Sequence, residues 1–444
     1  MVRIVHALPQ RDRGAVTRRE LTLLMLLCVV ALVVRIAAVL AHGHTMLVGD
    51  QRNYSAAGQL LARGRFGWEV EPFRPAHPSA FKAPLYPLWV GVLYSILGVH
   101  SEAVELVQAM VSLLTILCVW LMARRLFGPS VAVVAAALLA IYPLAWDHVT
   151  TLYPEAIAVP GYAAILWGTL GRRPTVRRAA AVGAACGVMM LLRPASVVLL
   201  VAVMVAWTVV SSWRRAMTLG GTTVACAALV IAPWTIRNAI VLHAFIPISE
   251  EDSAIEGTFN AVSASDRSAP YAWRAYTPLA LRLLAERPRP TEVEIRSVRL
   301  HAALHYIERH PASLFAAFFW NGLSRTWDIR GMSQVLADAR LEGRGPTLAR
   351  TGIIMYWILL PFALVGTWRL RRRKELLAPI LVLAIGTSIV YTAVAGTRYR
   401  APLEPVIAML AVSVFAPRLN SVGAKWLRHR LPDPSGAVTA TVAA

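Results

Sequence analysis

Apolar residues occur along this chain in about ten continuous runs, separated by short basic segments or by longer polar ones. The first run, Leu21–Ala41, is long enough to cross a bilayer as a single helix. The runs are continuously apolar and do not alternate with polar residues, which argues against a membrane β-barrel. The pattern therefore predicts an all-α polytopic membrane protein.

Basic clusters set the predicted orientation, because Lys and Arg gather on the cytoplasmic side of membrane spans. Clusters such as Arg124-Arg125 and Arg214-Arg215 follow every second run, and five arginines precede the first. With the N-terminus in the cytoplasm, this alternation predicts about ten spans. They are Leu21–Ala41, Glu105–Ala123, Val131–Trp146, Ala156–Leu170, Ala179–Leu192, Ser196–Trp213, Thr218–Pro233, Ile353–Trp368, Leu377–Ala395 and Pro402–Phe415.

One further apolar run, Leu85–Leu97, is too short for a span, and counting it would place Arg124-Arg125 outside. We interpret it as an interfacial or re-entrant helix within the first external loop. The predicted organisation is a cytoplasmic basic tail (1–20), a transmembrane module (21–417) with external loops at 42–104 and 234–351, and a cytoplasmic, disordered tail (418–444).

Composition agrees with a membrane protein, since 57% of the residues are hydrophobic and only 16% are charged. Soluble domains carry charge on about a quarter of their residues. The net charge of +21 comes mostly from the clusters between apolar runs and from the external loops. We therefore expect an anionic substrate and membrane lipids as partners, and no nucleic acid.

Two pairs of residues in the first external loop are candidates for chemistry. Asp50 lies just beyond the first span, where a carboxylate can take a proton from an acceptor hydroxyl. Its alternative role is to cap a helix, on which Tyr54 falls one turn later. Lys82 and Tyr86 are also one turn apart, and either hold a phosphate at headgroup depth or anchor the loop to the membrane.

Further candidates lie at the predicted outer ends of spans. The positive-inside rule does not explain arginines there, so together with Lys82 they predict a cationic site for a phosphate or diphosphate. An acid such as Glu155 is costly to bury in a membrane, so its position suggests a function; the alternative is that it begins a solvated helix. Asp147 and His148 are interpreted as plain loop residues. The outer-end candidates are Glu155, Arg193, Arg237, Arg398 and Arg400.

His42 and His44 bracket Gly43 near Asp50 and are the only suggestion of a divalent metal. Two histidines without a third ligand do not make a metal site, so no metal and no cofactor are predicted.

In chain order, four motifs resemble those of the GT-C glycosyltransferases, in particular the glycosyltransferase 39-like family of protein mannosyltransferases and aminoarabinose transferases. They are Gly49-Asp50 with Tyr54 and Lys82-Ala83-Pro84-Leu85-Tyr86, then Tyr153-Pro154-Glu155, then Pro233-Trp234-Thr235-Ile236-Arg237-Asn238, and Arg398-Tyr399-Arg400-Ala401-Pro402. The chain departs from many relatives at Gln51, where they have an acid, and at Ala83, where they have a proline.

The resemblance implies a GT-C fold and transfer of a sugar from a polyprenyl-phosphate donor to an acceptor outside the cytoplasmic membrane. It implies that Asp50 is the catalytic base and that Lys82 binds the donor phosphate. Arg193, Arg237, Arg398 and Arg400 would contact phosphate or sugar.

We therefore predict an inverting hexosyl- or pentosyltransferase in the cytoplasmic membrane, with its active site outside. The sugar (mannose, arabinose or aminoarabinose) and the acceptor (lipid, glycan or protein hydroxyl) stay open. The alternative is a transporter or flippase of a lipid-linked sugar or another anion, which would also need cations at one face; the absence of an inverted repeat in the sequence speaks against it.

Overall fold

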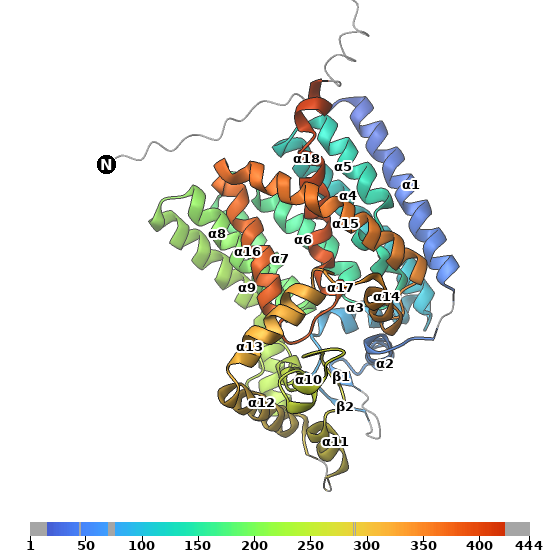
Figure 1. The fold of residues 1–444 in the computed structure, drawn as a ribbon, viewed down its shortest axis with the longest axis vertical. Helices are drawn as coiled ribbons and strands as arrows, with labels where there is room; N and C mark the ends of the chain where they lie inside the picture. Colours follow the sequence, from blue (N-terminus) through green and yellow to red (C-terminus); the bar gives the residue numbers. More distant parts are fainter. Residues whose placement is uncertain (1–15, 44–45, 70–75, 287, 289, 422–444) are drawn as a thin grey trace, which may run out of the picture.

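The computed structural model describes residues 16–43, 46–69, 76–286, 288 and 290–421, and this part of the chain is almost entirely helical (Figure 1). Each predicted span coincides with an apolar helix, which confirms the all-α polytopic fold. These helices are α1 (Arg18–His42), α4 (Ser101–Leu126), α5 (Pro129–Ile141), α6 (Glu155–Thr169), α7 (Val176–Leu192), α8 (Val197–Val210), α9 (Trp213–Leu242), α15 (Pro346–Arg369), α16 (Lys374–Val390) and α18 (Glu404–Ser413).

Four of these helices are long and apolar enough to cross a membrane: α1, α4, α9, and α15 with its extension to Arg372. Two of them pass the predicted span ends. Helix α9 continues through Pro233 to Leu242, and α15 begins at Pro346 rather than near Ile353. The polar segment between them is therefore shorter than the predicted loop 234–351.

The apolar helices pack side by side in the upper part of Figure 1, with α4 against α1, α5 and α6, and α7 against α9. Two glycines of α7 allow its close approach to α9. A Cβ atom at Gly183 would lie 2.4 Å from the carbonyl oxygen of Thr223, and one at Gly187 would lie 2.7 Å from that of Ala227. Small residues of this kind let helix backbones meet in membrane proteins.

The remaining elements, which include the short apolar helix α3, lie below and at the border of these helices (Figure 1). Helix α3 has the bounds predicted for the interfacial helix and packs against α2. The helices are α2 (Asp50–Ala62), α3 (Leu85–Leu97), α10 (Ala261–Ser265), α11 (Pro278–Ala285), α12 (Glu292–Arg309), α13 (Ala312–Ala317), α14 (Met332–Leu341) and α17 (Thr397–Arg400).

Short elements complete the described part of the chain. Strands β1 (Trp68–Glu69) and β2 (His77–Pro78) pair antiparallel, with Glu69 opposite His77. The 3-10 and π turns are η1 (Pro143–Ala145), η2 (Asp147–Thr150), η3 (Pro194–Ser196), η4 (Glu251–Gly257), η5 (Phe318–Arg325), η6 (Leu370–Arg372) and η7 (Ala401–Leu403). Most of the predicted tails, residues 1–15 and 422–444, and His44 lie outside the described residues.

A buried ion cluster holds α17 to the core and contains Arg400, one of the residues predicted to contact the substrate. Its guanidinium lies 2.7 Å from Glu404 Oε1 and 3.1 Å from Asp328 Oδ2, and stacks over Tyr356. The other oxygen of Glu404 accepts a hydrogen bond from the Tyr142 hydroxyl at 2.6 Å. All these side chains are buried, so Arg400 fixes the end of α17 and does not reach the outer surface.

We expect Arg400→Met to destabilise the protein by about 3–5 kcal/mol, because it leaves two buried carboxylates without their cation. Thermal unfolding of the purified protein in lipid nanodiscs measures this change. Arg296→Met is the matched control, since Arg296 pairs with Asp252 at the surface and should cost no more than about 1 kcal/mol. Equal melting temperatures for the Arg400→Met variant and the wild type would contradict this role.

Candidate functional site

Five of the predicted site residues come together at the border between the apolar helices and the polar part. Asp50 is the first residue of α2, and Lys82 lies in the segment leading into α3. Glu155 begins α6, Arg193 follows the end of α7, and Arg398 is the second residue of α17. These five residues are far apart in the sequence, but each lies at or near the end of a helix. They meet because those helix ends lie together at this border.

Asp50 does not cap its helix by its side chain. The capping position belongs to Gly49, whose φ of 53° is a conformation that favours glycine, and no side-chain cap forms. The Asp50 carboxylate instead lies between two cations. Its Oδ1 is 3.1 Å from Lys82 Nζ, and its Oδ2 accepts a hydrogen bond from Arg398 Nη2 at 3.0 Å.

These contacts decide the protonation state of Asp50. Burial alone would raise the pKa of its carboxyl, but the charges of Lys82 and Arg398, with their hydrogen bonds, outweigh it and hold the pKa below the ordinary value of 3.8. The same pairing outweighs the burial of Lys82 and raises its pKa well above 10.5. Asp50 is therefore an ionised carboxylate with both oxygens engaged.

The pairing around Asp50 continues on both sides as a chain of alternating charges. Lys82 Nζ lies 3.2 Å from Glu251 Oε1 of η4, and Arg398 Nε lies 3.6 Å from Glu342 Oε1 and 4.0 Å from Glu155 Oε1. Glu155 also pairs with Arg193. In order, the charge chain is Glu251, Lys82, Asp50, Arg398, Glu155 and Arg193.

Aromatic rings frame the two arginines of the charge chain. The Arg398 guanidinium lies 4.4 Å from the ring centre of Tyr153 and 4.7 Å from that of Tyr399. Arg193 lies 4.8 Å from Tyr399, which stacks on Tyr391. Stacking of this kind attracts the cation and fixes the plane of the guanidinium. Tyr399 belongs to a motif noted in the sequence, but neither Tyr399 nor Tyr391 was predicted as a site residue, because aromatics at the ends of membrane spans are common.

Gln51 locks the first turn of α2 in place. Its side chain is buried, its Nε2 donates to the carbonyl of Glu342 at 2.9 Å, and its Oε1 accepts from the backbone N–H of Leu152 at 3.1 Å. A carboxylate at this position would have no proton to give to the Glu342 carbonyl. The departure from many relatives thus has a positioning role next to Asp50.

A second buried ion cluster lies beside the site and corrects one prediction. Asp147 and His148 are not plain loop residues, since both are buried in η2. Asp147 contacts His148 Nδ1 at 2.9 Å and Arg344 Nη1 at 3.0 Å. Burial alone would raise the pKa of Asp147, but His148 and Arg344 outweigh it and hold the pKa at about 2. The cluster ties η2 to the connection between α14 and α15, which also carries Glu342.

Three predicted residues face elsewhere. Tyr86 is fully buried, donates to Gln108 Oε1 at 2.7 Å, and packs its ring edge-on against Tyr54. Arg237 donates to the carbonyls of Gly67 at 2.6 Å and Ser79 at 2.9 Å. Arg400 lies in the core cluster described above. None of the three contacts Asp50, because each is already bound to a partner in the protein interior or in the loop backbone.

Tyr54 supports the site from below. Its ring is buried and centred 5.7 Å from Lys82 Nζ, between that ammonium group and Tyr86. Burial raises the pKa of the Tyr54 hydroxyl well above its ordinary value of 10.0. It is therefore neutral and keeps Lys82 pointing toward Asp50.

The three cations of the expected site are already compensated in this structure, because they pair with four carboxylates. Lys82, Arg193 and Arg398 each face carboxylates, and Glu342 joins the three acids of the charge chain. An anion that binds here must displace carboxylates from these cations. Glu251 is the most exposed of these acids, at 36%, whereas Lys82 is 13% exposed.

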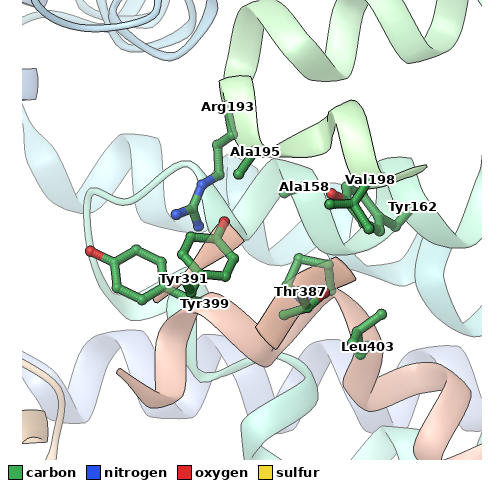
Figure 2. Close-up of a pocket in the computed structure, with 10 residues that line it drawn as sticks. Ala158, Tyr162, Arg193, Ala195, Val198, Thr387, Tyr391, Tyr399 and Leu403 are labelled. Carbon is green, nitrogen blue, oxygen red and sulfur yellow. The ribbon is translucent and has the colours of Figure 1, made fainter. Parts of the chain in front are cut away.

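A pocket opens at the Arg193 end of the charge chain (Figure 2). Arg193, Tyr391 and Tyr399 form its polar side. Ala158, Val198 and Leu403, from α6, α8 and η7, form apolar walls. The pocket thus combines one cation with an apolar surface between membrane helices.

Within the described ranges, no group of three or more His, Cys, Asp or Glu side chains is placed to hold an ion. His42 ends α1, and His44 lies among the residues that are not described.

Comparison with known families supports the resemblance inferred from the motifs. Residues 77–236, a little over a third of the chain, match the family described as dolichyl-phosphate-mannose-protein mannosyltransferase. This match contains Lys82, Glu155 and Arg193, and ends just before Arg237. No curated protein matches the chain by sequence.

Solved structures show that the fold is shared. The archaeal oligosaccharyltransferase AglB from Archaeoglobus fulgidus, in complex with an inhibitory peptide and a dolichol-phosphate, superposes with a TM-score of 0.57 at 15% identity. The match covers 94% of this chain and 52% of that one. The apo oligosaccharyltransferase from the same organism gives 0.55 at 16% identity, covering 93% and 52%.

This chain therefore spans about half the length of the oligosaccharyltransferase structures it matches. ArnT from Cupriavidus metallidurans bound to undecaprenyl phosphate matches at 16% identity over 94% of this chain and 82% of that one; its TM-score of 0.40 is too low to indicate a shared fold by itself. Together, the family match and the oligosaccharyltransferase fold confirm the resemblance to GT-C glycosyltransferases.

Proposed function

We propose that the protein transfers a sugar from a polyprenyl-phosphate donor to an acceptor hydroxyl at the outer face of the cytoplasmic membrane, with inversion at the sugar carbon. The observation that carries this proposal is the carboxylate of Asp50 held between Lys82 and Arg398 at the border of the apolar helices. The match to the mannosyltransferase family supports a polyprenyl-phosphate donor, because that family is described by its dolichyl-phosphate-mannose substrate.

The donor would enter through the pocket of Figure 2. Its prenyl chain would lie along Ala158, Val198 and Leu403, and its phosphate would reach Arg193 and then Arg398. An amphipathic ligand suits a pocket with apolar walls and a cation at one end. Arginine also suits a phosphate, because its planar donors match two phosphate oxygens.

In the reaction, the bond between the sugar C1 and the phosphate oxygen breaks, and the phosphate keeps the electron pair. The acceptor oxygen attacks C1 from the opposite face, and its proton passes to Asp50. Lys82 and Arg398 stabilise the charge that develops on the departing phosphate, so no general acid is required. The acceptor deprotonation is the step that depends on Asp50.

Donor binding would also change Asp50 itself. A phosphate that draws Lys82 and Arg398 toward itself weakens both contacts that hold the pKa of Asp50 low. The carboxylate then becomes a stronger base at the moment when the donor is in place. The carboxylates of the charge chain thus compensate its cations before the donor binds, and the cations then become available to the donor phosphate.

Sugar transfer from radiolabelled polyprenyl-phosphate sugars, measured in membranes, tests the proposal. We expect Asp50→Asn to lower transfer at least about a hundredfold, because it removes the base. Asp252→Asn, which neutralises an exposed acid paired with Arg296, is the control and should stay active. An active Asp50→Asn enzyme would refute the mechanism. Label that crosses sealed vesicles equally in both variants, without transfer, would favour the transporter.

The pH dependence of kcat/KM tests the electrostatics of the free enzyme. The base acts while deprotonated, and its lowered pKa means that this form is lost only when the pH falls below 3.8. We therefore expect no acid limb from Asp50 between about pH 5 and 8. Lys82→Met removes one of the two cations that lower the pKa of Asp50. The effect of burial, which raises that pKa, is then less opposed, and the acid limb should move to higher pH. An acid limb near neutrality that Lys82→Met does not move would contradict this assignment.

Glu251→Gln tests whether the donor must displace a carboxylate from Lys82. With that competitor neutralised, the KM for the donor should fall about two- to fivefold, the size expected for a partly exposed ion pair, while kcat changes little. Asp252→Asn removes the same charge from the same turn without touching Lys82 and should leave KM unchanged. A raised KM in Glu251→Gln would show instead that Glu251 contacts the substrate.

A further inference from the structure

A second pocket opens at the other end of the charge chain, on the far side of Lys82. It lies between the first external loop and α9, and none of the roles proposed so far uses it. Four aromatic rings and four polar side chains line it: Tyr54, Phe66, Trp68 and Trp234, with Asn53, Glu69, Ser79 and Lys82.

This lining has the chemistry that recognises a carbohydrate. One face of a sugar ring presents C–H groups that pack on an aromatic ring, while its hydroxyls need hydrogen-bond partners. Phe66 is 43% exposed, and its ring packs against Trp234 at 5.5 Å. The carboxamide of Asn53 has both donor and acceptor atoms and makes no hydrogen bond within the described part of the chain.

Hydrogen bonds of Arg237 and Ser79 fix the walls of the pocket. Arg237 ties its two sides together by donating to the carbonyls of Gly67 and Ser79. Gly67 has a φ of 72°, and a Cβ atom there would lie 2.7 Å from the Arg237 guanidinium. The Ser79 hydroxyl donates to Glu69 at 3.0 Å across the β1–β2 pair. Arg237, predicted as a substrate ligand, thus shapes this pocket from behind.

The position of the pocket relative to Asp50 indicates which substrate it takes. Lys82 lines the pocket and contacts Asp50 at 3.1 Å, whereas the pocket of Figure 2 lies at the Arg193 end. The proposed base therefore stands between two pockets. Inversion requires the acceptor hydroxyl to approach from the side opposite the leaving phosphate, so the second pocket lies where the acceptor belongs.

We infer that the pocket lined by Asn53, Phe66 and Trp68 binds a sugar ring of the acceptor, and hence that the acceptor is a carbohydrate rather than a protein serine or threonine. This inference rests on the proposed transfer reaction and names the substrate class of its second site. The acceptor hydroxyl would extend from the pocket past Lys82 to Asp50.

Saturation-transfer NMR on the full chain in lipid nanodiscs, free of sugar-based detergent, tests this inference without requiring turnover. The probes are methyl mannopyranoside, methyl arabinofuranoside and a short Ser/Thr-containing peptide. We expect at least one glycoside, and not the peptide, to bind. Its Kd should rise about fivefold in Phe66→Ala and in Asn53→Ala. Phe315→Ala, which removes a ring that is 79% exposed outside the pocket, is the matched control and should not change it.

Two further measurements separate the outcomes. Saturating polyprenyl phosphate should leave the glycoside bound, because the two pockets are distinct. Displacement by polyprenyl phosphate would overturn the inference in favour of a donor-sugar pocket. Absence of any glycoside binding, or binding unaffected by both pocket variants, would also overturn it. Transfer by wild type in the same nanodiscs reports independently on the proposed function.

Discussion

The structure of the site depends on one interaction, the double pairing of the Asp50 carboxylate with Lys82 and Arg398. The three residues belong to α2, to the segment before α3 and to α17, so this single carboxylate joins the first external loop to the C-terminal end of the chain. In surroundings of low polarity an unpaired charge is costly, so each member requires the other two. In the proposed mechanism this arrangement positions Asp50 as the base, and its low pKa keeps the carboxylate a weak base until a ligand competes for its cations.

The same requirement explains why a site proposed for an anionic substrate contains so many acids. Lys82 and Arg398 lie among aromatic rings and helix ends, where isolated cations would not be stable, and Glu251, Glu155 and Glu342 compensate them. In the proposed reaction, the donor phosphate competes with these carboxylates for the same cations. The two pockets lie at the ends of this charge chain, with Asp50 between them.

The sequence predicts the helices well, because apolar runs mark the segments in contact with lipid and basic clusters mark the cytoplasmic ends of spans. Both features can be identified in the sequence without knowing the fold. The sequence also predicts that Asp50, Lys82, Glu155, Arg193 and Arg398 share one side of the membrane, and in the structure they lie together, while their roles in the reaction stay predictions. What the sequence hides is the partner of each charge. The pairing of Asp147 with Arg344 and of Lys82 with Glu251 joins residues far apart along the chain. Arg237 binds backbone carbonyls, which no residue pattern reveals.

Arg398 and Arg400 show how local geometry separates two residues that look alike. They are two positions apart on α17, and side chains at that spacing on a helix point to nearly opposite sides. Only one can face Asp50, and the other must enter the core, where it needs Glu404 and Asp328. By fixing Arg400, the buried cluster fixes the rotation of α17 and keeps Arg398 directed at Asp50.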